Sequence, residues 1–440
     1  MKKALPILLL FSACFLFEDE KEDIIEDTIN TNIVLQHRAI AVTEIKLNII
    51  PEDSLADFTM ELTRNDSTVQ TLSIHSDTIL KDTGLNPNTS YTYTGYWMDG
   101  AERIGESNAL TVTTMDTTSH NFTWQIDTLG RYGSVIEDVW VVNENDIWVV
   151  GEMAVPDSTS NDGRDYFNVA HWDGITWEKI KIGSGKARFY NIHYFNENDI
   201  WIASGVIFHW NGEEWIMYHL WDMGVLNEDQ GGPRGGVWGT SSSNLYFAGE
   251  KGSIVHFNGN DWTVIESGTD YYIRDIWGVT DDITGESLIT MGCGNLIWAP
   301  SQLKIIQINK GGNLSYMNDE GISYSIHGIW FDDWPHYIVC GAGVFEYNED
   351  EDMWYEETTH SNVPYTNDVK GTAYNNLFVV GAFGDISHFN GVSWRHYWLR
   401  GEMPYYWNGE YLRTYVTESM VVTVGYDGSH GIIVRGTRNE

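Results

Sequence analysis

Two short segments of the chain decide its fold. Residues 145–151 read NDIWVVG, and residues 171–177 read HWDGITW. The first is an apolar run that ends on a glycine, which is typical of a short buried strand. In the second, Asp-Gly stands between two apolar stretches, and this dipeptide supplies the positive φ angles of a two-residue hairpin turn. Together they predict short antiparallel strands joined by tight turns.

The same pair of segments recurs along the C-terminal part of the chain. Clear copies are NDIWIASG with FHWNGEEW, NLYFAG with HFNGNDW, and NLFVVG with HFNGVSW. Three weaker copies keep the glycine that ends the first segment, so this glycine recurs every 40 to 54 residues, at positions 151, 205, 249, 292, 341, 381 and 425. Four short strands repeated at this interval form one propeller blade. We therefore predict a seven-bladed β-propeller over residues 120–440.

The two ends of this repeat region are expected to meet. The seventh copy stops at the end of the chain without its Trp-containing fourth strand. Residues 121–126, NFTWQI, resemble the fourth-strand segment TWEKI at 176–180. We expect residues 121–126 to pair as the outer strand of the last blade, which removes a free sheet edge. The repeats resemble Kelch-like and two-component-regulator-like propellers of secreted bacterial proteins.

A second, smaller β domain is predicted over residues 33–116. Residues 45–49 and 58–62 alternate apolar and polar side chains, as in strands with one buried face. Residues 85–91, LNPNTSY, resemble the L-x-P-x-T-x-Y segment of fibronectin type III domains. The resemblance implies a β-sandwich in which the Tyr91 hydroxyl closes a tyrosine corner, with Leu47 in place of the family's buried Trp. The whole chain is thus expected to be all-β.

The first 32 residues predict where the protein is located. Residues 1–13 combine two lysines with a short apolar run, as in a signal peptide, and the run is too short to span a bilayer as a helix. The following Cys14 resembles the lipidated cysteine of a bacterial lipobox. Residues 14–32 are acidic and resemble the surface-export signal of Bacteroidetes lipoproteins, and they also suit a flexible linker. We expect an outer-membrane lipoprotein, exposed at the cell surface, that meets the membrane only through Cys14.

Composition excludes several partners. The 440 residues carry 25 Lys+Arg against 63 Asp+Glu, a formal net charge of −38. Binding to a nucleic-acid backbone needs cationic side chains that displace counterions, so no nucleic-acid partner is predicted. Three cysteines exclude a disulfide scaffold. We expect Cys293 and Cys340 to be buried free thiols.

No pattern of catalytic, metal-binding or cofactor-binding residues stands out, and none is predicted. Four histidines share one repeat position, which favours packing and hydrogen bonding within the repeat: His171, His209, His256 and His388. Another shared position, on the innermost strand, either lines the central channel or packs between blades: Trp140, His193, Trp238, Trp277, Trp330, Lys370 and Tyr415.

The longest segments between predicted strands fall on one face of the propeller: 152–168, 217–235, 309–323 and 396–412. Loops held by a rigid scaffold often carry function. Two of them, 217–235 and 396–412, are rich in aromatic residues, including Tyr397. We expect a ligand platform on this face, formed by Trp221, Trp398, Tyr406 and Trp407; the alternative is that these aromatics fold back over their own blades.

The predicted function is that of a non-enzymatic binding lipoprotein, with a propeller face that binds a glycan or an envelope or extracellular protein. One alternative is a glycan-active enzyme with two carboxylates in the propeller mouth. Another is a structural subunit of an envelope complex. The fibronectin-like domain is expected to act as a spacer.

Overall fold

The computed structural model describes residues 33–51, 58–281, 284–294, 303–309, 311–332, 336–360, 365–398, 401–404, 406 and 408–439. The expected signal peptide, the linker with Cys14, and Trp407 lie outside these residues. The described elements are β-strands and two short 3-10 helices, η1 (Glu250–Gly252) and η2 (Thr358–His360). In the described part of the chain, no helix is long and apolar enough to cross a membrane.

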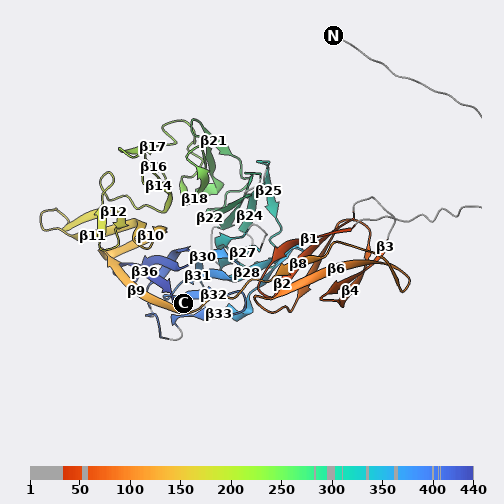
Figure 1. Ribbon diagram of the computed structural model, residues 1–440. Coiled ribbons are helices and arrows are strands. Elements are labelled where there is room, and N and C mark those ends of the chain that lie inside the picture. The colour runs from red at the N-terminus through yellow and green to blue at the C-terminus, as the bar shows by residue number, and fades with distance from the viewer. Residues whose placement is uncertain are drawn as a thin grey trace, which may run out of the picture.

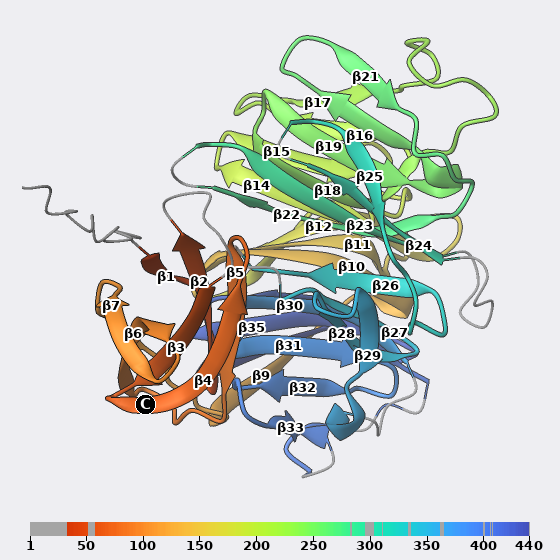
Figure 2. The same cartoon turned by 90° about the vertical axis from the view of Figure 1, so that its right-hand side faces the viewer.

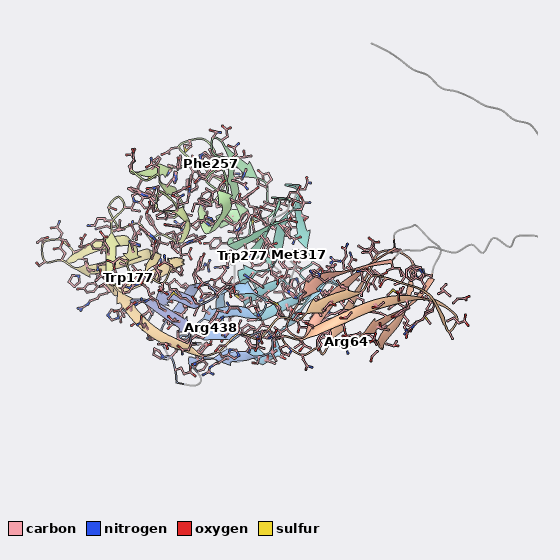
Figure 3. All side chains as sticks on the ribbon, viewed as in Figure 1. Arg64, Trp177, Phe257, Trp277, Met317 and Arg438 are labelled. Atoms are coloured by element: carbon pink, nitrogen blue, oxygen red, sulfur yellow. The ribbon has the colours of Figure 1, made fainter. Side chains whose placement is uncertain are left out.

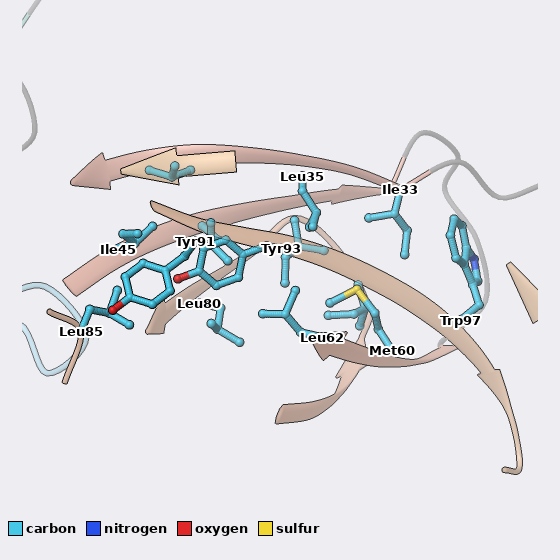
Figure 4. Packing of buried hydrophobic residues seen from close by; sticks show 14 residues of the cluster. Ile33, Leu35, Ile45, Met60, Leu62, Leu80, Leu85, Tyr91, Tyr93 and Trp97 are labelled. Atoms are coloured by element: carbon cyan, nitrogen blue, oxygen red, sulfur yellow. The ribbon is translucent and has the colours of Figure 1, made fainter. Parts of the chain in front are cut away.

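Eight strands form two facing sheets at the N-terminal end. The first sheet has the order β1-β2-β5: β1 (Ile33–Ile40), β2 (Glu44–Pro51) and β5 (Thr78–Thr83). The second has the order β4-β3-β6-β7, with β8 also paired to β6: β3 (Phe58–Arg64), β4 (Ser67–Ile74), β6 (Ser90–Asp99), β7 (Glu102–Glu106) and β8 (Leu110–Thr113). Alternating residues of both sheets meet in one apolar core (Figure 4).

The positions of Leu47 and Tyr91 in this domain are defined. Leu47 is fully buried within it. The Tyr91 hydroxyl accepts a hydrogen bond of 2.9 Å from the backbone N–H of Asn86, which is the kind of contact that a tyrosine corner makes.

Seven four-stranded antiparallel sheets follow, and we call them the ring sheets. The first four are made of consecutive strands: β10 (Arg131–Asn143), β11 (Asp146–Pro156), β12 (Arg164–Trp172) and β13 (Trp177–Ile180); β14 (Asn191–Asn196), β15 (Asp199–Ala203), β16 (Ile207–Trp210) and β17 (Trp215–Tyr218); β18 (Pro233–Ser241), β19 (Asn244–Gly249), β20 (Ile254–Phe257) and β21 (Trp262–Ile265); β22 (Ile273–Thr280), β23 (Ser287–Gly294), β24 (Leu303–Ile308) and β25 (Leu314–Met317).

The last three ring sheets complete the circle: β26 (Ile326–Trp330), β27 (Ile338–Gly341), β28 (Gly343–Asn348) and β29 (Met353–Glu356); β30 (Thr366–Ala373), β31 (Asn376–Gly381), β32 (Ile386–Phe389) and β33 (Trp394–His396); β34 (Glu410–Val416), β35 (Met420–Tyr426), β36 (Gly431–Arg438) and β9 (Phe122–Leu129). The first strand of each sheet contacts the first strand of the next, and β34 contacts β10. The sheets therefore surround a common axis, as in a β-propeller (Figure 1).

The predicted closure is confirmed by the pairing of β9 with β36. Trp124 lies opposite Gly436, and Val434 lies opposite Ile126.

Two of the long connecting segments are predicted wrongly. In 152–168, β11 extends to Pro156 and β12 begins at Arg164, so the connection is short. Residues 309–323 contain the strand β25. This fourth strand has no Trp and no Asp-Gly turn before it, so the repeat signal is missing there.

The shared histidines serve the repeat, as expected. His209 stacks on Trp201 with ring centroids 3.9 Å apart, and its Nε2 lies 2.9 Å from Asp199 Oδ1. His171 repeats this arrangement on Trp148 and Asp146. Cys293 and Cys340 are buried free thiols, again as expected.

The N-terminal sheets pack beside the ring, against the β26–β29 and β30–β33 sheets (Figures 1 and 2). Lys46 Nζ lies 2.8 Å from Glu349 Oε2, and Asn375 Nδ2 donates to the Asp116 carbonyl over 2.8 Å. His120 and His388 approach to 2.8 Å between their Nδ1 atoms.

We predict that Gly436→Val destabilises the ring closure. A Cβ atom at Gly436 would lie 2.4 Å from the Trp124 ring, so β9 and β36 could not keep their spacing. Overpacking of this kind costs about 1–3 kcal/mol. Thermal unfolding should show a lowered midpoint. The control is Thr437→Val, an exposed position on the same strand; equal midpoints for the two variants would contradict the prediction.

Candidate binding cavities on the ring axis

Three innermost strands of the ring sheets carry an aspartate at one equivalent position; Asp275 and Asp368 are buried and Asp138 is half-buried. Each aspartate uses its Oδ2 to accept a 2.9 Å hydrogen bond from a backbone N–H of the next ring sheet: Asp138 from Ile192, Asp275 from Ile329 and Asp368 from Thr414. These bonds hold neighbouring sheets together at the axis.

Glycine replaces aspartate where two sheets approach more closely. A Cβ atom at Gly236 would lie 3.2 Å from Ile276 N, and one at Gly328 would lie 2.8 Å from Val369 N. The Ile276 and Val369 amides are equivalent in position to the amides that the aspartate carboxylates bind between other ring sheets. A side chain at Gly328 would therefore push the β26 and β30 strands apart.

Two cations join the aspartates on the axis. Lys370 Nζ lies 2.7 Å from Asp275 Oδ2 and 2.9 Å from Asp368 Oδ1, and it donates to the Ile329 carbonyl over 3.2 Å. Lys370 thus connects three successive ring sheets. Burial alone would lower the pKa of Lys370, but the two carboxylates raise it, so the ammonium stays charged.

Arg413 extends from β34 across the axis. Its guanidinium donates to the Arg274 carbonyl over 2.8 Å and to the Asn367 carbonyl over 3.4 Å, so it links three ring sheets that are not all neighbours. We call Asp138, Asp275, Asp368, Lys370 and Arg413 the axial charge cluster. Burial raises the pKa of Asp138 to about 7, although Arg413 opposes the shift. Burial also raises the pKa of Asp275.

A cavity of about 420 Å³ lies on one side of the axial charge cluster, and we call it the aromatic cavity. Six of the seven residues predicted at the shared innermost position line it: Trp140, His193, Trp238, Trp277, Lys370 and Tyr415. They also pack between sheets; Trp140, for example, contacts both His193 and Tyr415, with centroids 4.7 and 5.1 Å apart. Both expected roles therefore apply. Trp330 is fully buried and donates to the Gly371 carbonyl of the next sheet.

A second cavity, of about 330 Å³, is lined mainly by polar side chains, and we call it the arginine cavity. Its lining includes Glu137, Arg234, Tyr272, Arg274, His327 and Arg413. Arg413 also lines the aromatic cavity, so its guanidinium stands between the two spaces. The long β17–β18 loop leads directly to Arg234, and the β33–β34 loop leads directly to Glu410, which lines the same cavity.

Burial and like charge control the ionisation of the arginine cavity. Burial, together with the nearby charges of Arg274 and Arg413, lowers the pKa of His327 to about 3. Burial also lowers the pKa of Arg274, while Arg413 opposes its charge. Burial raises the pKa of Glu137, against the attraction of Arg188. The groups around His327 therefore disfavour an additional positive charge.

The predicted platform residues lie apart from both linings. Trp221 is half-buried against the apolar core around β15 and β19. Trp398 and Tyr406 are half-buried against a second core that includes Tyr411. Tyr397, expected to be exposed, is fully buried because it packs on Trp124 and donates to the His120 carbonyl. Side chains fill the spaces between the ring sheets in this way throughout (Figure 3).

Sequence reasoning did not single out the three arginines of the cavity. Arg234, Arg274 and Arg413 stand two to four residues before Trp238, Trp277 and Tyr415, the shared innermost position. All three arginines lie on innermost strands, towards the side of the ring that carries the long loops. Comparing the residues just before the shared position across all repeats could therefore have found them.

Comparison with known proteins shows the fold class. No protein-family model matches the chain, and no curated protein matches it in sequence. Virginiamycin B lyase from Staphylococcus aureus is similar in structure, with a TM-score of 0.51 and 11% identity over 72% of this chain and 100% of the other. Together with the ring of four-stranded sheets, this likeness identifies the chain as a β-propeller protein, as predicted.

Two further structures are more distant. The Dos1 propeller has a TM-score of 0.43 and 8% identity over 71% of this chain and 95% of its own. The extracellular domain of the one-component system BT4673 from Bacteroides thetaiotaomicron has a TM-score of 0.37 and 9% identity over 69% of this chain and 45% of its own. At such identities the similarities concern the fold and carry no function to this chain.

We predict that Lys370→Met destabilises the ring, and more so at high pH. Without the ammonium, Asp275 and Asp368 keep their burial but lose the cation they share, and breaking a buried pair costs about 3–5 kcal/mol. The pKa of Asp275, which burial already raises and Lys370 opposes, then rises further above its unfolded value. The loss of stability is therefore largest at high pH, where Asp275 is ionised, and shrinks as acid protonates it. Denaturant unfolding at pH 5 and pH 8 measures the difference.

The matched control is Lys181→Met, which removes a half-exposed pair with Asp165. Exposed pairs contribute about 0–1 kcal/mol, so this variant should remain close to wild type. A Lys370→Met variant as stable as the control at pH 8 would show that the axial charge cluster does not hold the ring together.

Proposed function

We propose that this chain is a surface-anchored lipoprotein whose propeller binds an extracellular glycan or protein without changing it chemically. The observation that carries the proposal is the arginine cavity, a polar hollow on the ring axis at the side where long loops meet the innermost strands. Ligand sites are commonly concave and contain a few convergent polar groups. The described residues that line the cavity all belong to the ring, and none of them is from the N-terminal domain.

The finer description of the fold belongs to the same proposal. Seven ring sheets with contacts between successive first strands support one seven-bladed propeller. The strand orders β1-β2-β5 and β4-β3-β6-β7, together with the Tyr91–Asn86 hydrogen bond, support a fibronectin type III-like sandwich. In this reading the sandwich is a spacer that holds the propeller away from the membrane.

The axial carboxylates favour binding over catalysis. Asp138, Asp275 and Asp368 each hold a backbone amide of the next ring sheet, and the last two also share Lys370. A general acid or base must exchange protons with a substrate, whereas removing these carboxylates from their partners would loosen the ring. Their arrangement therefore suits a structural task.

A glycan-active enzyme is the second candidate, and one observation favours it. Glu137 and Glu410 both line the arginine cavity, and burial raises the pKa of Glu137. A carboxyl with a raised pKa beside a second carboxylate is the pattern of a glycosidase acid and its partner. Glu410, however, already accepts hydrogen bonds from Tyr426 and Asn367.

The anchor can be tested by Cys14→Ser. We expect the variant to lose incorporation of labelled fatty acid and to appear in the soluble fraction, because lipid would supply the membrane affinity. Metabolic labelling followed by membrane fractionation gives both readouts. Retention of the unlabelled variant in the outer membrane would contradict the lipoprotein assignment.

Binding can be tested with the purified protein lacking residues 1–14 on a glycan array, with Trp221→Ala and Trp398→Ala as variants. We expect a restricted set of glycans to bind without release of products detectable by mass spectrometry. If the two tryptophans contact the ligand, truncation should weaken binding by about 2 kcal/mol or more; if they only support the loops, melting temperature should fall instead.

Release of products, abolished by Glu137→Gln, would favour the enzyme over the binding protein. Binding to no glycan and to no purified envelope protein would overturn the proposal as a whole.

A further inference from the structure

We propose that the arginine cavity binds one acidic sugar unit, a uronic acid, with its carboxylate on the arginines and its hydroxyls on the glutamates. This inference rests on the binding function proposed above and names the chemistry of its ligand. The cavity brings Arg234, Arg274 and Arg413 together, although the chain has only 25 basic residues against 63 acidic ones.

The arginines are held in place before any ligand arrives. The Arg234 guanidinium lies over the Tyr190 ring, 5.2 Å from its centroid, and Arg274 lies over Tyr272 at 5.0 Å. Arg274 Nε also donates to the Gly294 carbonyl over 2.8 Å. Side chains that are already ordered lose less entropy on binding, and guanidinium groups match carboxylates in geometry.

The arrangement leaves one guanidinium donor, Arg234 Nε, that an anion can satisfy. Arg413 donates to the backbone carbonyl of Arg274, so the two arginines lie close together. Arg234 makes an ion pair with Glu250 through Nη1, while its Nε is buried and has no hydrogen-bond partner within the described part of the chain. The depressed pKa of His327 reflects burial and the same pair of arginines. A carboxylate would lower the repulsion among these groups.

The glutamates distinguish a sugar acid from a simple anion. Glu137 and Glu410 line the same cavity, and they repel a doubly charged sulfate or phosphate more strongly than a single carboxylate. Their oxygens can accept hydrogen bonds from hydroxyl groups, which a uronic acid carries on the same ring as its carboxylate. The volume of about 330 Å³ lies at the small end of ligand pockets, which suits a single sugar unit.

The test is isothermal titration of the purified protein with glucuronate, galacturonate, trigalacturonate, glucose and galactose. We expect the uronates to bind, the neutral sugars not to bind, and the affinity to fall with added salt. If monomer and trimer both bind, the ligand is the terminal unit of a chain. If only the monomer binds, the ligand is a free sugar acid, and if only the trimer binds, it is an internal unit. Each of these outcomes supports the inference.

Variants locate the site. Arg234→Gln and Arg274→Gln should each weaken uronate binding at least about tenfold, as expected for the loss of a charge-assisted hydrogen bond. Arg103→Gln, in the N-terminal domain and half-exposed, is the matched control and should bind as wild type does. Circular dichroism and melting curves confirm that each variant is folded. In labelled-histidine NMR, uronate should shift the His327 signal and leave that of His75, on the N-terminal domain, in place.

Several results would overturn the inference. They are equal binding of neutral sugars, uronate binding that is unchanged in both arginine variants, a shift of His75 without one of His327, or no binding of any uronate. If uronates fail while the glycan array identifies a neutral glycan, only the ligand class is wrong. If neither assay finds a ligand, the proposed function fails with it.

Discussion

The ring depends on how the carboxylates of three aspartates are hydrogen-bonded at its axis. Asp138, Asp275 and Asp368 each hold an amide of the next ring sheet, and Lys370 and Arg413 supply the opposing charge. Apolar packing between sheets supplies most of the driving force for folding, but it is non-directional. The charged hydrogen bonds are directional, and an incorrect stagger of two innermost strands would leave a buried carboxylate without its donor.

The axial charge cluster also divides the space along the axis. Three carboxylates face two cations, and the pKa of Asp138 near 7 relieves this imbalance because the group can take up a proton. Arg413 lies between an aromatic cavity and an arginine cavity, so the two ends of one axis offer different chemistry. A ligand in either cavity must fit beside groups that hold the ring together. This constraint favours recognition through the cavity walls over chemistry at the axis.

The parts of the structure that were predictable from the sequence are those encoded within one repeat. The Asp-Gly and Asn-Gly turns, the stacking of His209 on Trp201 and the match of residues 121–126 to a fourth strand all depend on local patterns. β25 was not predicted because its sequence lacks those patterns. The pairing of β9 with β36 could be foreseen because a closed ring has to cover its last edge.

The axial charge cluster and the arginine cavity could not be predicted in the same way. Arg413 donates to the carbonyl of Arg274, 139 residues earlier, and Lys370 pairs with Asp275, 95 residues earlier. The repeat that contains each of these residues does not show which distant residue it meets. Their meeting depends on the number of sheets in the ring and on the angle between them, which local patterns do not specify.

The surroundings of the arginine cavity limit what can reach it. The chain carries a net charge of −38, so its long-range field opposes the approach of a polyanion, and this opposition is strongest at low ionic strength. The arginines act only at contact distance, where their hydrogen bonds are made. A ligand with one carboxylate among neutral hydroxyls meets less repulsion on approach than a densely charged chain, yet it can make the same contacts once inside. The acidic exterior and the basic cavity would therefore select together for a weakly charged sugar.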